Sequence, residues 1–279
     1  MKKLGVNKTL DTLWATAAFV LTVLVFFPVL WMILCATRPN QDLFVFPVPI
    51  IQKTFTLDAF RVIFSQADVP RSLFNTVFVS LSATLFCLII AAFGAFGMSR
   101  YRFKGRRVLQ FYILMTQMLP VILIAIPFFK VFMQLGLYDT KAGLILAYTS
   151  FSLPFCSLTL LGFFGGIPRS LDEAAQIDGC THLGSFIKII MPISKTGLVS
   201  TGIFAFVTAW NEYLMALILT NSNRSQMLVV VIGKKIGQYD IAWNELMAIT
   251  ALASLPLIIM YAFMQKSFMR GLTAGSVKM

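Results

Sequence analysis

Charged side chains are scarce in this chain. They make up 12% of its 279 residues, whereas hydrophobic residues make up 58% and the mean hydropathy is +0.83. A soluble domain averages about 25% charged residues, so these totals exclude an ordinary soluble protein and indicate an integral membrane protein.

Acidic residues are fewer still. The chain has 11 acidic and 23 basic residues, which gives a formal net charge of +12. A nucleic-acid-binding protein of this charge would show a basic patch interleaved with aromatic residues. The basic residues instead lie at the ends of apolar runs, where anionic membrane lipid is the expected neighbour, and we expect no nucleic-acid partner.

Side chains that commonly bind metals and cofactors are also rare. The sequence has a single histidine, His182, and no C-x-x-C pair. The four cysteines, Cys35, Cys87, Cys156 and Cys180, are therefore predicted to be small buried side chains rather than a disulfide framework or a metal site. No G-x-x-x-x-G-K-S/T loop is present, so ATP is not expected to bind this chain in that way.

Long apolar runs are abundant, and six of them reach the length of about 20 residues that a membrane helix needs. The first run is too long for the apolar core of a signal peptide, which has about 7–15 residues. We predict an all-α integral membrane protein with six transmembrane helices, at 13–36, 72–98, 108–132, 142–164, 196–219 and 246–265.

One short loop carries the clearest topological mark. Its basic residues are Arg100, Arg102, Lys104, Arg106 and Arg107. If successive loops alternate between the two sides of the membrane, the side with both termini and this loop has 14 Lys and Arg residues, and the other side has 9. Because cytoplasmic loops carry the excess of basic residues, we predict that the N- and C-termini are cytoplasmic.

The spans and the segments between them divide the chain into three parts. Residues 1–70 are predicted to hold the N-terminal tail, the first span and an extracytoplasmic segment with a short amphipathic piece at 57–64. Residues 71–266 are predicted to form the transmembrane core, in which the connector 220–245 is polar. Residues 267–279 are predicted to be a cytoplasmic tail.

The loop at 165–195, between the fourth and fifth spans, has strong helix signals. Ser170 and Glu173 have the S-x-x-E spacing of a capping box, which predicts a helix that begins at Leu171. Gly179 is placed to end this helix in a left-handed turn. On these features alone the loop fits a capped, solvated connector.

A second helix is predicted after Thr181, which can cap it, and Pro192 is expected to stop it. The spacing across both helices resembles the EAA loop of ATP-binding-cassette (ABC) importer permeases. That pattern normally has leucine before the proline, and here it has Met191, an apolar side chain of similar size. In that family the loop is a coupling helix that docks on a separate ATPase, so the resemblance implies an ATPase-coupling role for Glu173, Ala174, Ala175, Asp178, Gly179, Ile189 and Pro192.

Three further stretches, at 97–107, 210–213 and 270–278, resemble the carbohydrate branch of these permeases, the maltose-type, type I importers. With the coupling loop, the resemblance covers nearly everything after residue 55. It implies a permease subunit, not itself an enzyme, in the bacterial cytoplasmic (inner) membrane, which moves a sugar or oligosaccharide by alternating access.

The resemblance also implies partners. They are a second, different permease chain, two ATPase subunits that bind the ATP and Mg²⁺, and an extracytoplasmic sugar-binding protein, so this chain would hold no cofactor itself. A competing hypothesis is a secondary transporter driven by H⁺ or Na⁺, but such proteins place ionisable groups near the midplane, and these spans are almost uncharged. A membrane scaffold or sensor would explain neither the coupling spacing nor the near absence of soluble sequence.

Glu212 is the only acidic residue well inside a predicted span, and its charge would cost a few kcal/mol if it faced lipid. It is expected either to face a wet cavity on the substrate path or to pair with a polar group that holds two permease chains together. Successive helical residues differ by about 100°, so three neighbours cannot share one face, and Tyr213 fits the membrane interface best. The substrate-path candidates are Asn211, Glu212, Tyr213, Gln117 and Ser150.

Overall fold

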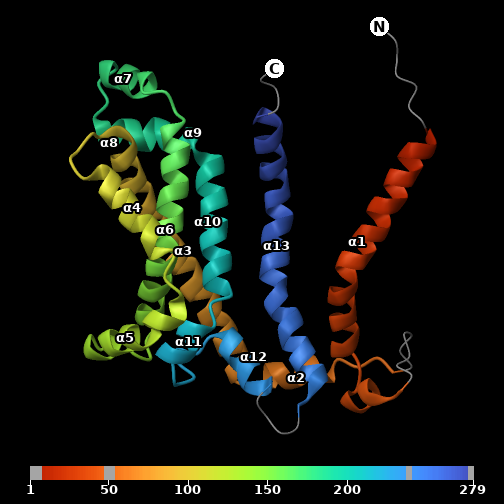
Figure 1. The fold of residues 1–279 in the computed structure, drawn as a ribbon. Coiled ribbons are helices and arrows are strands. Elements are labelled where there is room, and N and C mark those ends of the chain that lie inside the picture. Colours follow the sequence, from red (N-terminus) through yellow and green to blue (C-terminus); the bar gives the residue numbers. More distant parts are fainter. Residues whose placement is uncertain (1–7, 47–53, 237–240, 276–279) are drawn as a thin grey trace. The chain divides into compact units, whose positions relative to one another are not determined.

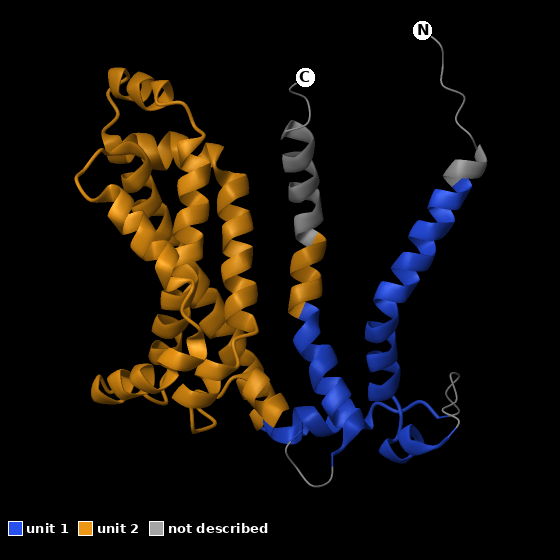
Figure 2. Cartoon of the chain, in the orientation of Figure 1, with its two compact units in different colours: residues 1–67, 234–255 blue, residues 68–233, 256–279 orange. Residues whose placement is uncertain are grey.

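The structure of the chain is a computed structural model that describes residues 8–46, 54–236 and 241–275. Every element of these described residues is a helix, which confirms the predicted all-α fold (Figure 1). The chain divides into two compact units, which Figure 2 shows in different colours. Unit 1 holds residues 1–67 and 234–255, and unit 2 holds residues 68–233 and 256–279.

Unit 2 contains the candidate functional segments. Its long helices α3 (Asp68–Arg100) and α6 (Lys141–Gly165) pack against each other, and α10 (Lys195–Trp210) packs against both. The shorter elements are α4 (Arg106–Thr116), α5 (Val121–Gln134), α7 (Ser170–Ile177), α8 (His182–Ser185), the π-helical turn η2 (Phe186–Ile190), α9 (Met191–Ile193), α11 (Leu214–Leu219) and most of α12 (Leu228–Ile236).

Unit 1 brings the start of the chain together with a later segment. Trp243 begins the last helix, and its backbone N–H donates a hydrogen bond to Asn40 Oδ1 at 3.0 Å. The short helix α2 coincides with the predicted amphipathic piece at 57–64. The helices of this unit are α1 (Lys8–Ala36), η1 (Asn40–Phe44), α2 (Asp58–Ser65) and the first part of α13 (Trp243–Gly275).

Four helices in the described part of the chain are long and apolar enough to cross a membrane, or up to six if each of two bent pairs forms one span. The four match the predicted first, second, fourth and sixth spans. They are Thr12–Ala36, Asp68–Arg100, Lys141–Gly165 and Trp243–Ala262.

The other two predicted spans are interrupted in the structure. The third becomes α4 and α5, which meet at 99°. Pro120 stands between them and ends the first helix, because proline has no N–H to donate and disfavours helical backbone at the residue before it. The fifth breaks at residues 211–213, between α10 and α11, and α10 itself meets the segment before it at 79°.

The last helix is longer than predicted. α13 continues to Gly275, past the predicted end of the sixth span at residue 265, because no proline interrupts the chain after Pro256. Part of the predicted C-terminal tail is therefore helical. The rest of that tail, residues 276–279, lies outside the described residues.

The connector 220–245, predicted to be polar, contains the helix α12. Leu228, the first residue of that helix, is almost completely buried. The side chain of Asn75 on α3 donates hydrogen bonds to the carbonyls of Arg224 and Gln226, each at 3.0 Å. Polar groups of α3 thus fix the chain just before α12.

Two clusters of buried hydrophobic side chains fill unit 2. One lies around Tyr148 and joins α3, α5, α6, α10, α11 and α12. The other lies around Phe186 and joins α3, α6, η2 and α10. Ala91, Ala92 and Ala95 of α3 are buried in this second cluster, which supports the end of unit 2 that carries α7.

Candidate functional site

The coupling segment begins with α7, a helix of eight residues. It starts at Ser170, one residue earlier than predicted, with Arg169 in the N-cap position and no side-chain cap. The predicted capping box is therefore wrong. The backbone N–H of Glu173, which Ser170 would have accepted from, already donates to the carbonyl of Arg169 at 3.1 Å.

Two other local predictions about this segment are confirmed. Gly179, just after α7, has a φ of +83°, a left-handed conformation that glycine adopts without strain. Thr181 caps α8, because its hydroxyl accepts a hydrogen bond from the N–H of Gly184 at 3.0 Å. The chain between the two helices therefore turns where the sequence requires it to turn.

The second helix ends one residue after Pro192, where the sequence predicts its stop. The helical path continues from α8 through η2 into α9 and ends at Ile193. η2 is a π-helical turn, in which the N–H of Met191 donates to the carbonyl of Phe186, five residues back. This π-helical turn lies just before Pro192, which has no backbone N–H to donate. Single π-turns inside helices are frequent at functional sites.

α7 has an inner and an outer face. Asp172 and Ala175 are buried, whereas Glu173 and Ala174 are exposed and Ile177 is 87% exposed. The segment as a whole presents exposed large apolar side chains at Leu171, Ile177, Leu183, Ile187 and Ile193. A set of exposed apolar side chains on a polar connector is typical of a surface that a partner covers.

The predicted coupling residues do not all lie on one surface. Ala175 points into unit 2, and Ile189 is half-buried in η2. Pro192 is exposed in α9. The exposed members on α7 and the turn after it are Glu173, Ala174, Asp178 and Gly179.

Arg100 belongs to this site, although its place in the sequence predicts only a cation of the basic loop. Its Nε lies 2.7 Å from Oδ2 of Asp172, and the two side chains are only 9% and 11% exposed. Its Nη1 donates to the carbonyl of Phe164 at 3.0 Å, and the hydroxyl of Ser185 donates to Oδ1 of Asp172 at 2.8 Å. No spacing rule connects these positions, and the only available signal was the place of Arg100 at the end of an apolar span.

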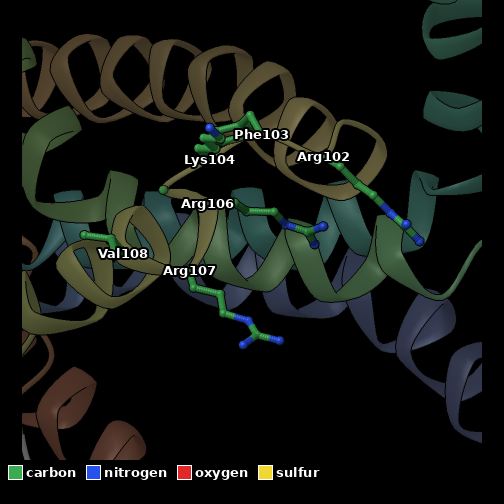
Figure 3. Close-up of a pocket in the computed structure, with 7 residues that line it drawn as sticks. Arg102, Phe103, Lys104, Arg106, Arg107 and Val108 are labelled. Atoms are coloured by element: carbon green, nitrogen blue, oxygen red, sulfur yellow. The ribbon is translucent and has the colours of Figure 1, made fainter.

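The rest of the basic loop is different. Arg102, Lys104, Arg106 and Arg107 border a shallow hollow of about 510 Å³, and none of them has an ion-pair partner among the described residues. Figure 3 shows that these side chains fan out from the loop and do not converge on one point. They fit a cationic surface better than a site for one small ligand.

A smaller hollow of about 300 Å³ lies beside α7. His182, predicted to be an ordinary surface residue, is exposed at its edge, with Nδ1 3.1 Å from Nε2 of Gln176. In the described ranges, no group of three His, Cys, Asp or Glu residues could hold a metal ion. The hollow is lined by Phe96, Arg100, Tyr101, Arg169, Asp172, Glu173, Gln176 and His182.

Glu212, the acidic residue of the fifth predicted span, has a local role in the chain break. Its carboxylate accepts a hydrogen bond from the N–H of Met215 at 3.0 Å, so it satisfies a donor of the first turn of α11. Its carbonyl accepts from the hydroxyl of Tyr148 at 3.1 Å. The side chain is only half-buried, so the carboxylate holds this bond while remaining in reach of a ligand or a partner.

The neighbours of Glu212 make different contacts, and the helical spacing used in the prediction does not apply to them, because residues 211–213 are not helical. The amide of Asn211 donates to the carbonyl of Val207 at 2.9 Å, and its side chain is exposed. Tyr213 is 43% exposed, and its ring packs closely over Gly233, where an added Cβ would lie 2.9 Å from the ring.

The two remaining substrate-path candidates lie on other elements. Gln117 follows α4, in the bend before α5, and Ser150 lies in α6, where its hydroxyl donates to the carbonyl of Leu146 at 2.8 Å. Both are exposed, and among the described residues neither shares a hydrogen bond with Asn211 or Glu212.

The coupling segment and the break at residues 211–213 lie at different levels of unit 2. Figure 1 shows α7 and α8 at one end of this unit and α5 and α11 toward the opposite end. α10 connects the two levels, and its 16 residues span about 24 Å. A movement of the coupling segment must therefore travel through helices to reach the candidate substrate path.

Comparison with known proteins identifies the family. The model of the family "binding-protein-dependent transport system inner membrane component" matches residues 85–273, well over half of the chain. The chain belongs to this family. It is thus a multi-pass permease of the bacterial inner membrane and not an enzyme, as the resemblance in its sequence implies.

Named members of the family match along nearly the whole chain. The sulfoquinovosyl glycerol transport system permease protein SmoH of Agrobacterium fabrum is 32% identical over 94% of this chain and 92% of its own length. The trehalose transport system permease protein SugB of Mycobacterium tuberculosis is 33% identical over 96% of this chain and 97% of its own. The predicted resemblance to the carbohydrate branch of ABC importer permeases is confirmed.

A solved structure shows the same fold. A chain of a bacterial ABC transporter involved in the import of the acidic polysaccharide alginate superimposes with a TM-score of 0.82 and 22% identity. The match covers 95% of this permease and 98% of that chain. The interruptions in the third and fifth predicted spans therefore belong to a chain with the permease fold.

Proposed function

We propose that this permease moves a sugar or oligosaccharide across the inner membrane by alternating access, driven by ATP hydrolysis on a separate subunit. The substrate class rests on the relatives, which are named for sulfoquinovosyl glycerol and for trehalose. Residues 71–266 form the transport core in this proposal, and the substrate path passes the break at residues 211–213. Gln117 and Ser150 are further candidates along that path.

The proposal that the EAA loop couples transport to the ATPase rests on the exposed face of α7. Ile177 at 87% exposure and Glu173 lie on the outer side of a helix whose inner side is buried. The apolar side chain of Ile177 and the carboxylate of Glu173 are both exposed on this short helix. A cleft on a partner protein could cover Ile177 and place a basic side chain next to Glu173. The ATPase subunit is the partner that the family pattern supplies.

The assembly in this proposal contains a second, different permease chain, two ATPase subunits and an extracytoplasmic sugar-binding protein. The family description itself names dependence on a binding protein. ATP and Mg²⁺ bind to the ATPase subunits, and the termini and the coupling loop face the cytoplasm. Closure of the ATPase dimer shifts the coupling loops, and the helix bundles rock between two discrete packings.

Capture of the ATPase tests this proposal. We expect the tagged native chain, solubilised gently from its own membranes, to bring down a subunit that hydrolyses ATP. Ile177→Asp should reduce that capture by at least about 10-fold, which corresponds to a loss of 1.4 kcal/mol of binding free energy. The matched control is Ile236→Asp, since Ile236 of α12 is also an exposed isoleucine but does not lie on the coupling segment.

The outcome separates the competing hypotheses. If the native chain captures no ATPase under conditions that keep the second permease bound, ATP-driven transport is wrong and an ion-driven carrier becomes the better explanation. If Ile177→Asp and Ile236→Asp capture the ATPase equally well, the chain is ATP-driven but α7 is not its docking helix.

A further inference from the structure

A buried ion pair ties the coupling segment to the membrane helices. Arg100 ends α3, and Asp172 lies in the first turn of α7, with Nε and Oδ2 2.7 Å apart. Ser185 of α8 donates to the other oxygen of the same carboxylate, and the carbonyl of Phe164 in α6 accepts from Nη1 of the arginine. Residues of four helices, α3, α6, α7 and α8, therefore meet at this ion pair.

Burial makes this pair unusual among the ion pairs of the described residues. The other two pairs have clearly more exposed side chains, 81% and 68% for Arg61 and Asp58 and 17% and 20% for Lys235 and Glu245. A buried pair contributes little to net stability, because desolvation of the two ions offsets much of their attraction. What it does provide is a fixed geometry, since removal of either partner leaves an uncompensated buried charge.

Packing around the pair is equally restrictive. The ring of Phe186 in η2 stacks on Phe96 of α3 with centroids 4.4 Å apart, and it meets Phe164 of α6 edge-on at 5.9 Å. A second arginine, Arg169, donates from Nη2 to the carbonyl of Ser99 at 3.2 Å. The inner side of the coupling segment is thus held by charge, by hydrogen bonds and by aromatic contacts at once.

We propose that Arg100, Asp172 and Ser185 form a rigid anchor that makes α7 move as one body with α3 and α6. The inference rests on the proposed coupling role of α7 and deepens it by naming the residues through which displacement of α7 reaches the membrane helices. Without the anchor, α7 turns about its two ends, the chain before Arg169 and the left-handed Gly179. The docked helix then shifts while α3 and α6 stay in place.

The geometry also explains why these three side chains act as positioning residues. Their side chains are almost completely buried against α3, α6 and α8, whereas the face of α7 with Glu173 and Ile177 is exposed and free to dock. Docking and transmission are therefore separate properties of one short helix. Variants of the anchor should change transmission and leave docking in place.

A distance measurement between α7 and α3 tests the anchor. Spin labels are attached at Gln176→Cys on α7 and Ile90→Cys on α3, both exposed positions, in a chain without its four native cysteines. Pulsed electron paramagnetic resonance then gives the distance distribution in the assembled transporter, without nucleotide and after trapping with ATP and vanadate. We expect one narrow distribution that is the same in both states.

The variants give the decisive comparison. Asp172→Ala and Arg100→Ala should widen the distribution at least two-fold, whereas Arg100→Lys, which keeps the charge, should widen it less. Because a single change leaves one buried charge, Arg100→Met with Asp172→Leu serves as a variant with no unpaired charge, and we expect it to assemble and still show a wide distribution. Arg102→Ala, an exposed cation of the same region, is the matched control and should change nothing.

Two results would overturn the anchor. One is a narrow distribution in the alanine variants and in the charge-free double variant. The other is a wide distribution in the native chain. Failure of the proposed function is a separate result, because a native chain that captures no ATPase still yields a distance distribution for α7 and α3.

Discussion

Oδ1 of Asp139 accepts a hydrogen bond from the backbone N–H of Ser222 at 3.0 Å, which clasps the turn before α6 to the loop after α11. The same oxygen accepts from the N–H of Asn221 at 2.9 Å and from the hydroxyl of Ser225. Asp139 has a φ of +54°, and its own N–H donates to the carbonyl of Leu219 at 2.9 Å. Asp139, a single residue in a left-handed conformation, therefore supplies hydrogen-bond partners for several groups of the loop after α11.

The Asp139 clasp should make stability depend on pH. Burial raises the pKa of the Asp139 carboxyl, but the hydrogen bonds from the neighbouring loop lower it more, and the net pKa lies below its ordinary value. A lowered pKa means that the charged clasp contributes stability above the ordinary aspartate pKa of about 3.9, and that this contribution is lost as the pH falls below it. We expect Asp139→Asn to lower the melting temperature at pH 7, and to lower it less near pH 3, because the contribution falls progressively below the ordinary aspartate pKa.

Asparagine is the informative replacement because it also tolerates the left-handed conformation, so the change removes charge without adding strain. Asp58→Asn is the control, since Asp58 pairs with Arg61 on an exposed helix surface and its loss should leave the melting temperature nearly unchanged at both pH values. Equal melting temperatures for the native chain and Asp139→Asn at pH 7 would show that the clasp does not stabilise the fold.

Much of the membrane architecture could be predicted from the sequence, because it depends on composition over long windows. Four continuous spans follow from runs of apolar residues, and the turn at Gly179 follows from the conformational freedom of that residue. The breaks could not be placed in the same way. Glu212 looks like an isolated charge in a span until the N–H of Met215 is seen to donate to it.

The candidate site likewise has one part that the sequence predicts and one part that it does not. Its exposed outer face was predictable, since Glu173 and its neighbours follow a local spacing. The anchor was not, because Arg100 and Asp172 are 72 positions apart in the numbering and only tertiary packing brings them together. Five clustered cations predict a basic loop, and no local signal separates Arg100, whose side chain is only 9% exposed, from the other four, which have no ion-pair partner among the described residues.

Membrane topology is a prediction that labelling can check directly. Single cysteines at Lys104→Cys in the basic loop and at Ser222→Cys in the loop after α11 are placed in a background without the native cysteines. We expect an impermeant maleimide to label Ser222→Cys in intact cells and Lys104→Cys only after permeabilisation, since basic loops stay in the cytoplasm. Permeabilised cells should label both positions, and labelling of Lys104→Cys alone in intact cells would reverse the topology.

The outer face of the coupling helix gives another prediction. Glu173→Ala and Gly179→Leu should both abolish ATP-driven uptake while the chain remains in the membrane. Loss of a carboxylate paired in the docked complex removes roughly 3–5 kcal/mol, and a Cβ at a φ of +83° strains the turn that aims the helix. Uptake in reconstituted vesicles and the amount of chain in the membrane are measured together. Gly179→Asn is the control, because asparagine also tolerates this conformation, and it should retain most of the uptake.

The break at residues 211–213 allows a test of the substrate path. Glu212→Gln keeps an oxygen that can accept from the N–H of Met215, so α11 retains its first bond and only the charge is lost. Asn211→Ala removes an exposed amide that donates, among the described residues, to the carbonyl of Val207 in α10. If these side chains border the path, we expect each change to reduce uptake at least about 10-fold, the effect of 1.4 kcal/mol, with assembly intact.

Sugar hydroxyls need acceptors as well as donors, and the break provides both, since Asn211 offers an amide and Glu212 a half-buried carboxylate. The measurement is uptake and ATP hydrolysis in vesicles that contain the complete transporter, with a sugar first shown to bind its binding protein. Tyr213→Phe tests the third residue of the break, because it keeps the ring that packs on Gly233 and removes only the hydroxyl. A structural role predicts a different pattern, in which Asn211→Ala and Glu212→Gln leave uptake unchanged, or abolish it only by preventing assembly with the second permease.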